Sequence, residues 1–99
     1  MFFKVISNKT RWQIINTLYN SDKCVSEICK DTNEEQSKVS HNLKILAECN
    51  IVFNKRDGKN KIYSLNKETI RPILNILEKH MKTYCSNCPH KLIIKNKLD

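Results

Sequence analysis

Two thiols near the end of the chain have the spacing of a metal-binding half-site. Cys85 and Cys88 are separated by two residues, and His90 follows two positions later. Such a turn brings two sulfurs and a ring nitrogen within reach of one ion, and thiolates favour Zn(II), another soft metal ion or a metalloid such as As(III). A redox thiol pair shares the Cys-x-x-Cys spacing, and inert cysteines are the third interpretation. The spacing is compatible with all three interpretations.

A second group of residues is suited to nucleic acid. Within residues 37–46, Val39, Leu43 and Leu46 recur at helical spacing and define one apolar face. Hydroxyl and cationic side chains fill the opposite face and suit phosphate oxygens and base edges. The residues predicted to contact DNA from this helix are Gln36, Ser37, Lys38, Ser40, His41 and Lys44.

The ends of this helix carry recognisable capping residues. Asn33 followed three positions later by Gln36 resembles a capping box, so Asn33 is the expected N-cap. Asn50 can adopt the left-handed conformation that ends a helix. Cys49, just before it, is expected to pack against the core.

Shorter apolar patterns precede the polar helix and predict the elements that support it. A helical turn or two is expected over residues 2–6, and Ser7 or Asn8 is expected to cap a second helix. A third, short helix follows with Ser26 as its expected N-cap, and Cys29 is expected in the core. Together with the polar helix this predicts a helix-turn-helix, for which Thr10 and Arg11 are candidate phosphate contacts.

A cationic β-hairpin is predicted after the polar helix. Residues 51–53 and 61–65 are β-prone, and Asp57-Gly58 between them is a strong turn signal that contains the only glycine of the chain. A hairpin beside a helix-turn-helix can lie along the DNA backbone. Its predicted DNA contacts are Lys55, Arg56, Lys59 and Lys61.

The last predicted helix covers about residues 68–84 and carries a long apolar stripe. The stripe includes Ile73, Leu77, Met81 and Tyr84, which is more apolar surface than a terminal helix of a small monomer leaves bare. We therefore expect a homodimer that buries this stripe together with Phe2-Phe3. The predicted organisation is one DNA-binding and dimerisation domain over 1–84 and a Cys-containing tail over 85–99.

Composition agrees with a polyanionic partner. The chain has 99 residues and a net charge of +8, with 18 Lys and Arg against 10 Asp and Glu. A genome rich in A·T pairs would also enrich Lys, Asn and Ile, so charge alone is weak support. The sequence shows no membrane span or signal peptide, so a cytoplasmic protein without membrane contact is expected. With no Ser/His/Asp set, paired carboxylates or Gly-rich phosphate loop, an enzyme is not expected.

The ordered set of motifs resembles the ArsR/SmtB family of dimeric winged-helix repressors. The resemblance runs from about residue 5 to residue 66 and includes Cys24-Val25-Ser26-Glu27-Ile28, the polar helix and the hairpin ending in Tyr63-Ser64-Leu65. It implies a mainly α fold with a β-hairpin wing, a major-groove helix over 34–48, and dimerisation through the first and last helices. It also implies release of double-stranded DNA when an inducer binds. His41-Asn42 departs from the Arg-His pair usual in the family.

The resemblance also bears on the cysteines. Metal-sensing members carry a ligand at the start of the third helix, often within Cys-Val-Cys; here Cys24 matches the first thiol and Ser26 replaces the second. Cys24 is therefore the candidate fourth ligand of a metal ion held by Cys85, Cys88 and His90. A redox-responsive regulator, a constitutive regulator with a structural zinc, and a winged-helix protein-interaction module remain alternatives.

Overall fold

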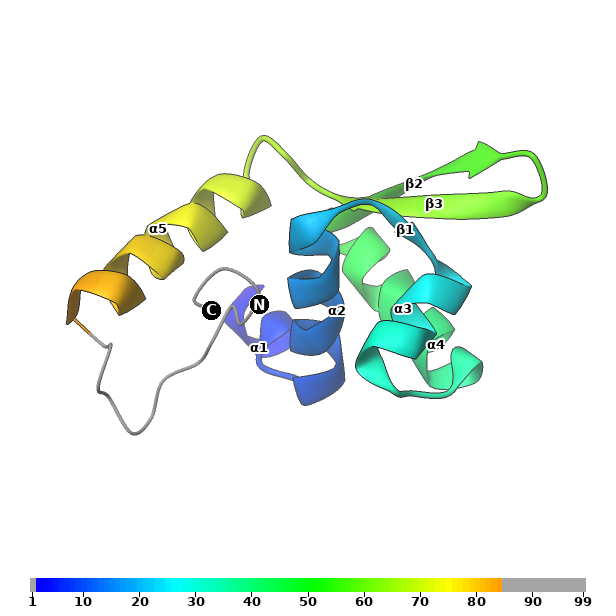
Figure 1. Ribbon diagram of the computed structural model, residues 1–99, viewed down its shortest axis with the longest axis horizontal. Coiled ribbons are helices and arrows are strands. Elements are labelled where there is room, and N and C mark those ends of the chain that lie inside the picture. The colour runs from blue at the N-terminus through cyan, green and yellow to red at the C-terminus, as the bar shows by residue number, and fades with distance from the viewer. Residues whose placement is uncertain (1, 85–99) are drawn as a thin grey trace. The chain divides into compact units, whose positions relative to one another are not determined.

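The structure is a computed structural model that describes residues 2–84. It divides after Asn66 into two compact units, whose helices and strands Figure 1 labels. In chain order the elements are α1 (Phe2–Ile6), α2 (Lys9–Asn20), β1 (Lys23–Cys24), α3 (Val25–Thr32), α4 (Gln36–Glu48), β2 (Val52–Asp57), β3 (Asn60–Leu65) and α5 (Ile70–Tyr84).

Helices α2, α3 and α4 pack together to form the core of the first unit. Each helix places its apolar positions three or four residues apart, so these side chains meet on the inner face. The fully buried side chains include Ile14 and Leu18 of α2, Ile28 of α3, and Val39 and Leu43 of α4. A helix-turn-helix of α3 and α4 braced by α2 is therefore confirmed.

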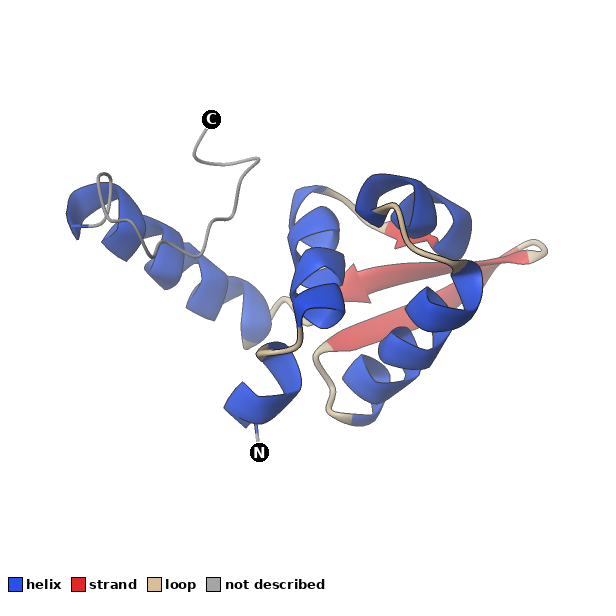
Figure 2. Cartoon of the chain, turned by 90° about the horizontal axis from the view of Figure 1, so that it is seen from below, coloured by secondary structure: helices blue, strands red, loops and turns tan. Residues whose placement is uncertain are grey.

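The hairpin of β2 and β3 closes one side of this core through Val52 and Leu65, which pair across the strands and are buried. Its two-residue loop begins at Gly58, whose φ of +64° suits glycine and explains why the glycine stands here. The far end of the hairpin extends past the helices in both views (Figures 1 and 2). The predicted wing is therefore confirmed.

A third strand was not predicted from the sequence. β1 pairs antiparallel with β3, with Lys23 opposite Tyr63 and Cys24 opposite Ile62, which gives the order β1-β3-β2. A two-residue strand is too short to show the alternation that marks a strand in sequence. It ties the segment between α2 and α3 to the wing.

The expected N-cap of the polar helix is wrong. Asn33 instead ends α3 in the left-handed conformation (φ 57°, ψ 40°), and its N–H donates to the carbonyl of Cys29. Helix α4 begins two residues later than a cap at Asn33 requires, with Glu35 as N-cap and no side-chain capping bond. Asparagine suits both an N-cap and a left-handed C-cap, so the local sequence favours neither.

Other caps follow the predictions with one exception. Asn8 caps α2, since its side chain accepts a hydrogen bond from the N–H of Arg11 at 3.1 Å, and Asn50 adopts φ 58° after α4. Ser26 is not the N-cap of α3. That position belongs to Cys24, whose N–H donates to Glu27 Oε1 at 3.1 Å.

The second unit contains α5, which begins at Ile70 with Pro72 in its first turn, where a missing N–H costs nothing. Ile70 and Leu74 are buried. Met81 is half-buried. Four further large apolar side chains of the helix leave more than a third of their surface exposed, and they are Ile73, Ile76, Leu77 and Tyr84. α5 therefore carries several exposed apolar side chains.

Candidate nucleic-acid interface

The outer face of α4 is the first part of the candidate interface. Val39, Leu43 and Leu46 face the core, so the residues between them are turned outward. The six predicted DNA contacts on this helix are all exposed, and they are Gln36, Ser37, Lys38, Ser40, His41 and Lys44. Four of them, at positions 37, 40, 41 and 44, follow helical spacing and form one stripe. This stripe offers hydroxyl, imidazole and ammonium groups.

Lys38 has a partner on the protein that the sequence-based interpretation did not include. Its Nζ lies 3.3 Å from Glu34 Oε1, four residues earlier. An exposed pair of this kind contributes about 1 kcal/mol or less and is screened by salt. Lys38 can therefore leave this carboxylate for another anion at little cost.

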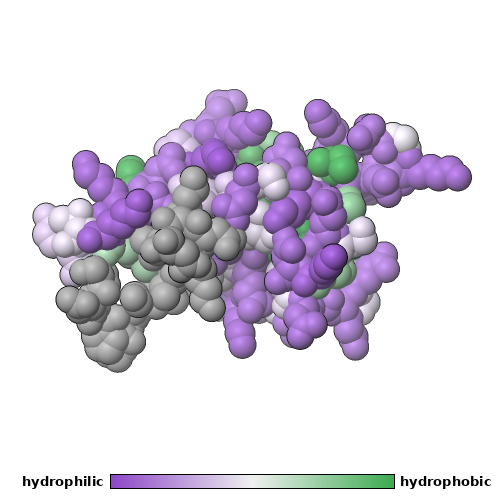
Figure 3. All heavy atoms as spheres, in the orientation of Figure 1, coloured by the Kyte–Doolittle hydropathy of each residue, from purple (hydrophilic) through white to green (hydrophobic). Residues whose placement is uncertain are grey.

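The four cations of the wing are divided between its two faces. Arg56 lies directly opposite Lys61, whereas Lys55 lies opposite Ile62, and side chains of neighbouring residues point to opposite faces of a strand. Lys59 occupies the loop. All four are exposed, and hydrophilic side chains cover the far end of the wing in the space-filling view (Figure 3).

Thr10 and Arg11 of α2, the two candidate phosphate contacts outside α4 and the wing, face the protein. Thr10 is 5% exposed, which leaves little of its surface for a phosphate. Arg11 donates from Nη1 to the carbonyl of Val5 at 2.9 Å and from Nε to Asn42 Oδ1 at 3.1 Å. Its guanidinium therefore joins α1, α2 and α4 instead of projecting into solvent.

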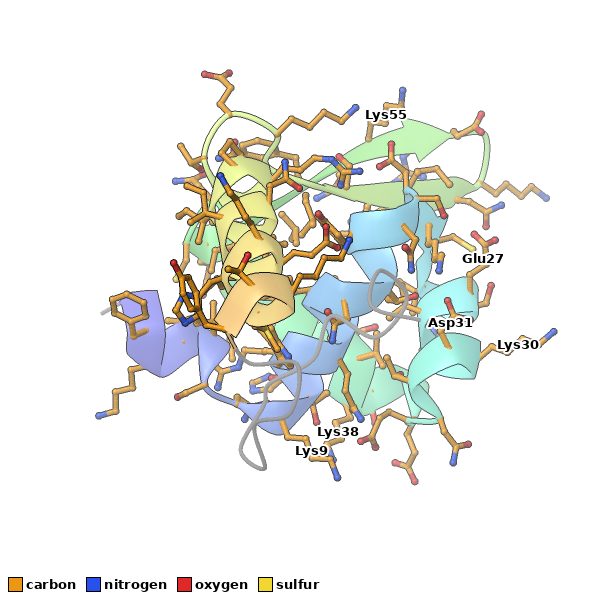
Figure 4. All side chains as sticks on the ribbon, turned by 60° about the vertical axis from the view of Figure 1, so that its left-hand side comes forward. Lys9, Glu27, Lys30, Asp31, Lys38 and Lys55 are labelled. Carbon is orange, nitrogen blue, oxygen red and sulfur yellow. The ribbon has the colours of Figure 1, made fainter. Side chains whose placement is uncertain are left out.

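A polar cluster fixes α3 against α2 and β1. Lys23 Nζ forms an ion pair with Asp31 and donates to Thr17 Oγ1 at 2.6 Å, and Thr17 also donates to the Asp31 carboxylate. The hydrogen bond from Lys23, followed by that from Thr17, lowers the pKa of Asp31 below its ordinary value. Asp31 stands on α3 in Figure 4. This cluster holds the first helix of the helix-turn-helix in place.

Three cysteines fall within the described residues, and they are not grouped. Cys24 is half-buried, with its Sγ 3.2 Å from Ser26 Oγ. Cys29 is half-buried, in partial agreement with the core prediction, and desolvation raises the pKa of its thiol. Cys49 is exposed, so its predicted packing role is wrong.

Of the four predicted metal ligands, Cys24 falls within the described residues. Over residues 2–84 no three His, Cys, Asp or Glu side chains gather in a way that could hold an ion. Cys24 can supply one thiolate there. Cys85, Cys88 and His90 lie outside the described residues.

Comparison with known proteins identifies the family of this chain. Residues 8–53 match the sequence profile of the bacterial regulatory proteins of the arsR family. The transcriptional repressor SdpR of Bacillus subtilis is 32% identical over 73 residues, which are 74% of this chain and 81% of SdpR. The chain belongs to the ArsR family. The arsenical resistance operon repressor of the same organism is 31% identical, over 74% of this chain and 70% of that protein.

Solved structures share the fold of this chain. Rv0081 of Mycobacterium tuberculosis has a TM-score of 0.77 and 30% identity, over 87% of each chain. The homodimeric winged helix-turn-helix DNA-binding domain of Mb0332 from Mycobacterium bovis has a TM-score of 0.76 at 21% identity, over 90% of this chain and 82% of that domain. The predicted family and winged-helix fold are therefore confirmed, and the protein is a DNA-binding transcriptional regulator. No helix within residues 2–84 has the length and apolar character needed to cross a membrane.

Proposed function

We propose that this ArsR-family protein is a homodimeric repressor that reads duplex DNA with the exposed stripe of α4. The observation that carries the proposal is the division of α4 into a buried apolar face and an exposed face of hydroxyl, imidazole and ammonium groups. Ser40 and His41 stand at the centre of this stripe and would contact base edges. Lys38, Lys44 and the wing cations would bind phosphates, which gives affinity with little sequence information.

Sequence preference tests the reading role of α4. A preferred duplex is first selected from a random pool by the wild-type protein, and the Ser40→Ala and His41→Ala variants are then compared with it. We expect the base preference to change at one or two positions, because each lost base contact costs about 1–3 kcal/mol of discrimination. Ser26→Ala removes an exposed hydroxyl from α3 and serves as the control.

Two outcomes would contradict this assignment. An unchanged preference in both α4 variants would mean that another element reads the bases. Wild-type binding to the selected duplex no tighter than to random duplex, at physiological salt, would favour a protein-interaction module that uses the same basic surface.

Dimerisation is proposed through α5 and α1. Ile76 of α5 is 68% exposed and Phe3 of α1 is 78% exposed, and apolar surface of this extent favours association. A dimer would present two copies of α4 to successive major grooves, whose separation is about 34 Å.

A soft metal ion or metalloid is proposed as the inducer, with Cys85, Cys88, His90 and Cys24 as its ligands. The half-buried Cys24 thiol and the name of the arsenical resistance operon repressor among the relatives support this. When bound, such an ion would supply a crosslink between these thiolates. Because thiolates are the binding form, the site would weaken as pH falls.

Affinity for the selected duplex with and without Zn(II), Cd(II) or As(III) tests the inducer. We expect at least one of them to weaken DNA binding by the wild type and to leave a Cys85→Ser/Cys88→Ser variant unchanged. Equal affinity under all conditions would reject sensing by these thiols. Release of the wild type by oxidants alone, with a resistant variant, would replace the metal by the redox interpretation.

A further inference from the structure

Asn42 lies on α4 and does not belong to its exposed stripe. The residue is 6% exposed, and both ends of its side-chain amide form hydrogen bonds. Oδ1 accepts from Arg11 Nε at 3.1 Å, and Nδ2 donates to the carbonyl of Lys38, one turn earlier, at 2.8 Å. This residue therefore connects α2 to the stretch of α4 that carries the exposed stripe.

Arg11 uses the fixed fork of its guanidinium to hold two elements at once. While Nε binds Asn42, Nη1 donates to the carbonyl of Val5 at the end of α1. A cation at a helix C-terminus is favourable, because the free carbonyls there carry partial negative charge. α1 has five residues, too few to be stable as an isolated helix, so this bond is one of the contacts that keep it folded against α2.

We infer that Arg11 is a positioning residue for DNA binding. Through Asn42 it holds α4 in the placement that contacts DNA, and through Val5 it couples this placement of α4 to the docking of α1. The hydrogen bonds form one path, from the Val5 carbonyl through Arg11 and Asn42 to the Lys38 carbonyl. Without the guanidinium, Asn42 Oδ1 becomes a buried acceptor with no donor, which is costly enough to favour a shift of α4. The inference rests on the proposed reading role of α4.

Lysine cannot replace arginine in this role. A lysine ammonium keeps the positive charge but lacks the planar fork that fits two acceptors in fixed directions. A charge-preserving Arg11→Lys variant therefore separates positioning from electrostatic attraction to DNA.

A double-mutant cycle tests the inference. Affinity for the selected duplex and for random duplex is measured over a range of salt concentrations for wild type, Arg11→Met, Asn42→Leu and the double variant. We expect each single variant to lose about tenfold in affinity for the selected duplex and less for random duplex. The salt slope should not change, the double variant should bind no worse than either single variant, and Arg11→Lys should recover only part of the loss.

Lys9→Met provides the matched control, because it removes one positive charge from the same turn of α2 at an exposed position (Figure 4). It should leave the ratio of selected to random binding unchanged. Urea unfolding of every variant confirms that folded protein is compared. If Arg11→Met fails to fold, Arg11→Lys takes its place in the cycle with Asn42→Leu.

Three results would overturn the inference. A salt slope reduced by about 0.9 in Arg11→Met, with effects that add to those of Asn42→Leu, would make Arg11 a phosphate contact. Unchanged affinity in both single variants would remove any positioning role, as would full recovery by Arg11→Lys. Failure of the reading role of α4 is detected separately, by an unchanged base preference in the Ser40 and His41 variants.

Discussion

Individual side chains hold the helix-turn-helix together, and Asp31 does so through its ion pair with Lys23 and its hydrogen bond from Thr17. Because its folded-state pKa is lowered, the ionised carboxylate stabilises the fold above the unfolded-state pKa, and this contribution is lost as pH falls through the folded value. We expect Asp31→Asn to unfold at lower urea than wild type near neutral pH, by about 1 kcal/mol or less because the pair is partly exposed. The difference should narrow below about pH 4.

Urea titrations at several pH values check this expectation, with Asp22→Asn as the control for an exposed carboxylate outside the cluster. A difference between Asp31→Asn and wild type that stays constant from neutral to acid pH would show that the ion pair with Lys23 contributes nothing measurable.

At the scale of elements, we expect the wing to combine a cost in stability with a gain in DNA affinity. Arg56 and Lys61 lie directly opposite each other, and like charges in such a pair destabilise a hairpin by about 0.2–1 kcal/mol. A polyanion would relieve this repulsion. We therefore expect Lys61→Gln to stabilise the free protein slightly, while it weakens DNA binding and reduces the slope of log affinity against log salt by about 0.9.

Lys59 lies in the hairpin loop, where no cation is paired opposite it. Lys59→Ala should therefore reduce the salt slope without raising the stability of the free protein. Both variants should keep the base preference of the wild type. If neither changed affinity or slope, the wing would have no contact with DNA.

At the scale of the whole molecule, the proposed dimer depends on the exposed apolar side chains of α5. Each large apolar side chain fully buried contributes roughly 1.5–3 kcal/mol before the entropy cost of association. We expect Leu77→Glu to produce monomers, because a carboxylate at the interface would have to be desolvated. The monomer should also lose affinity for the selected duplex, since one copy contacts a single half-site.

Sedimentation measures the expected change, and Lys79→Glu, two residues further along the same helix, controls for the added negative charge. Circular dichroism separates a folded monomer from an unfolded chain. An intact dimer of Leu77→Glu with unchanged sedimentation would place the interface elsewhere.

Features that depend on neighbours in the chain could be predicted from the sequence. The two faces of α4 follow from helical periodicity, and the hairpin follows from a glycine between two β-prone segments, because both signals lie within a few residues. The exposure of the polar side chains on α4 and the wing follows from the same local patterns, whereas their contacts with DNA stay a prediction. The ordered motifs were sufficient to predict the family, which the comparisons confirmed.

Only the tertiary structure decided features that join distant segments. Asn33 suits either end of a helix, and the packing of α3 against α4 selected the C-cap. Arg11 resembles an exposed cation in sequence until Val5 and Asn42 are placed beside it. Strand β1 forms because Lys23 and Cys24 pair with Tyr63 and Ile62 of β3, and no local preference encodes pairing between residues so far apart in the chain.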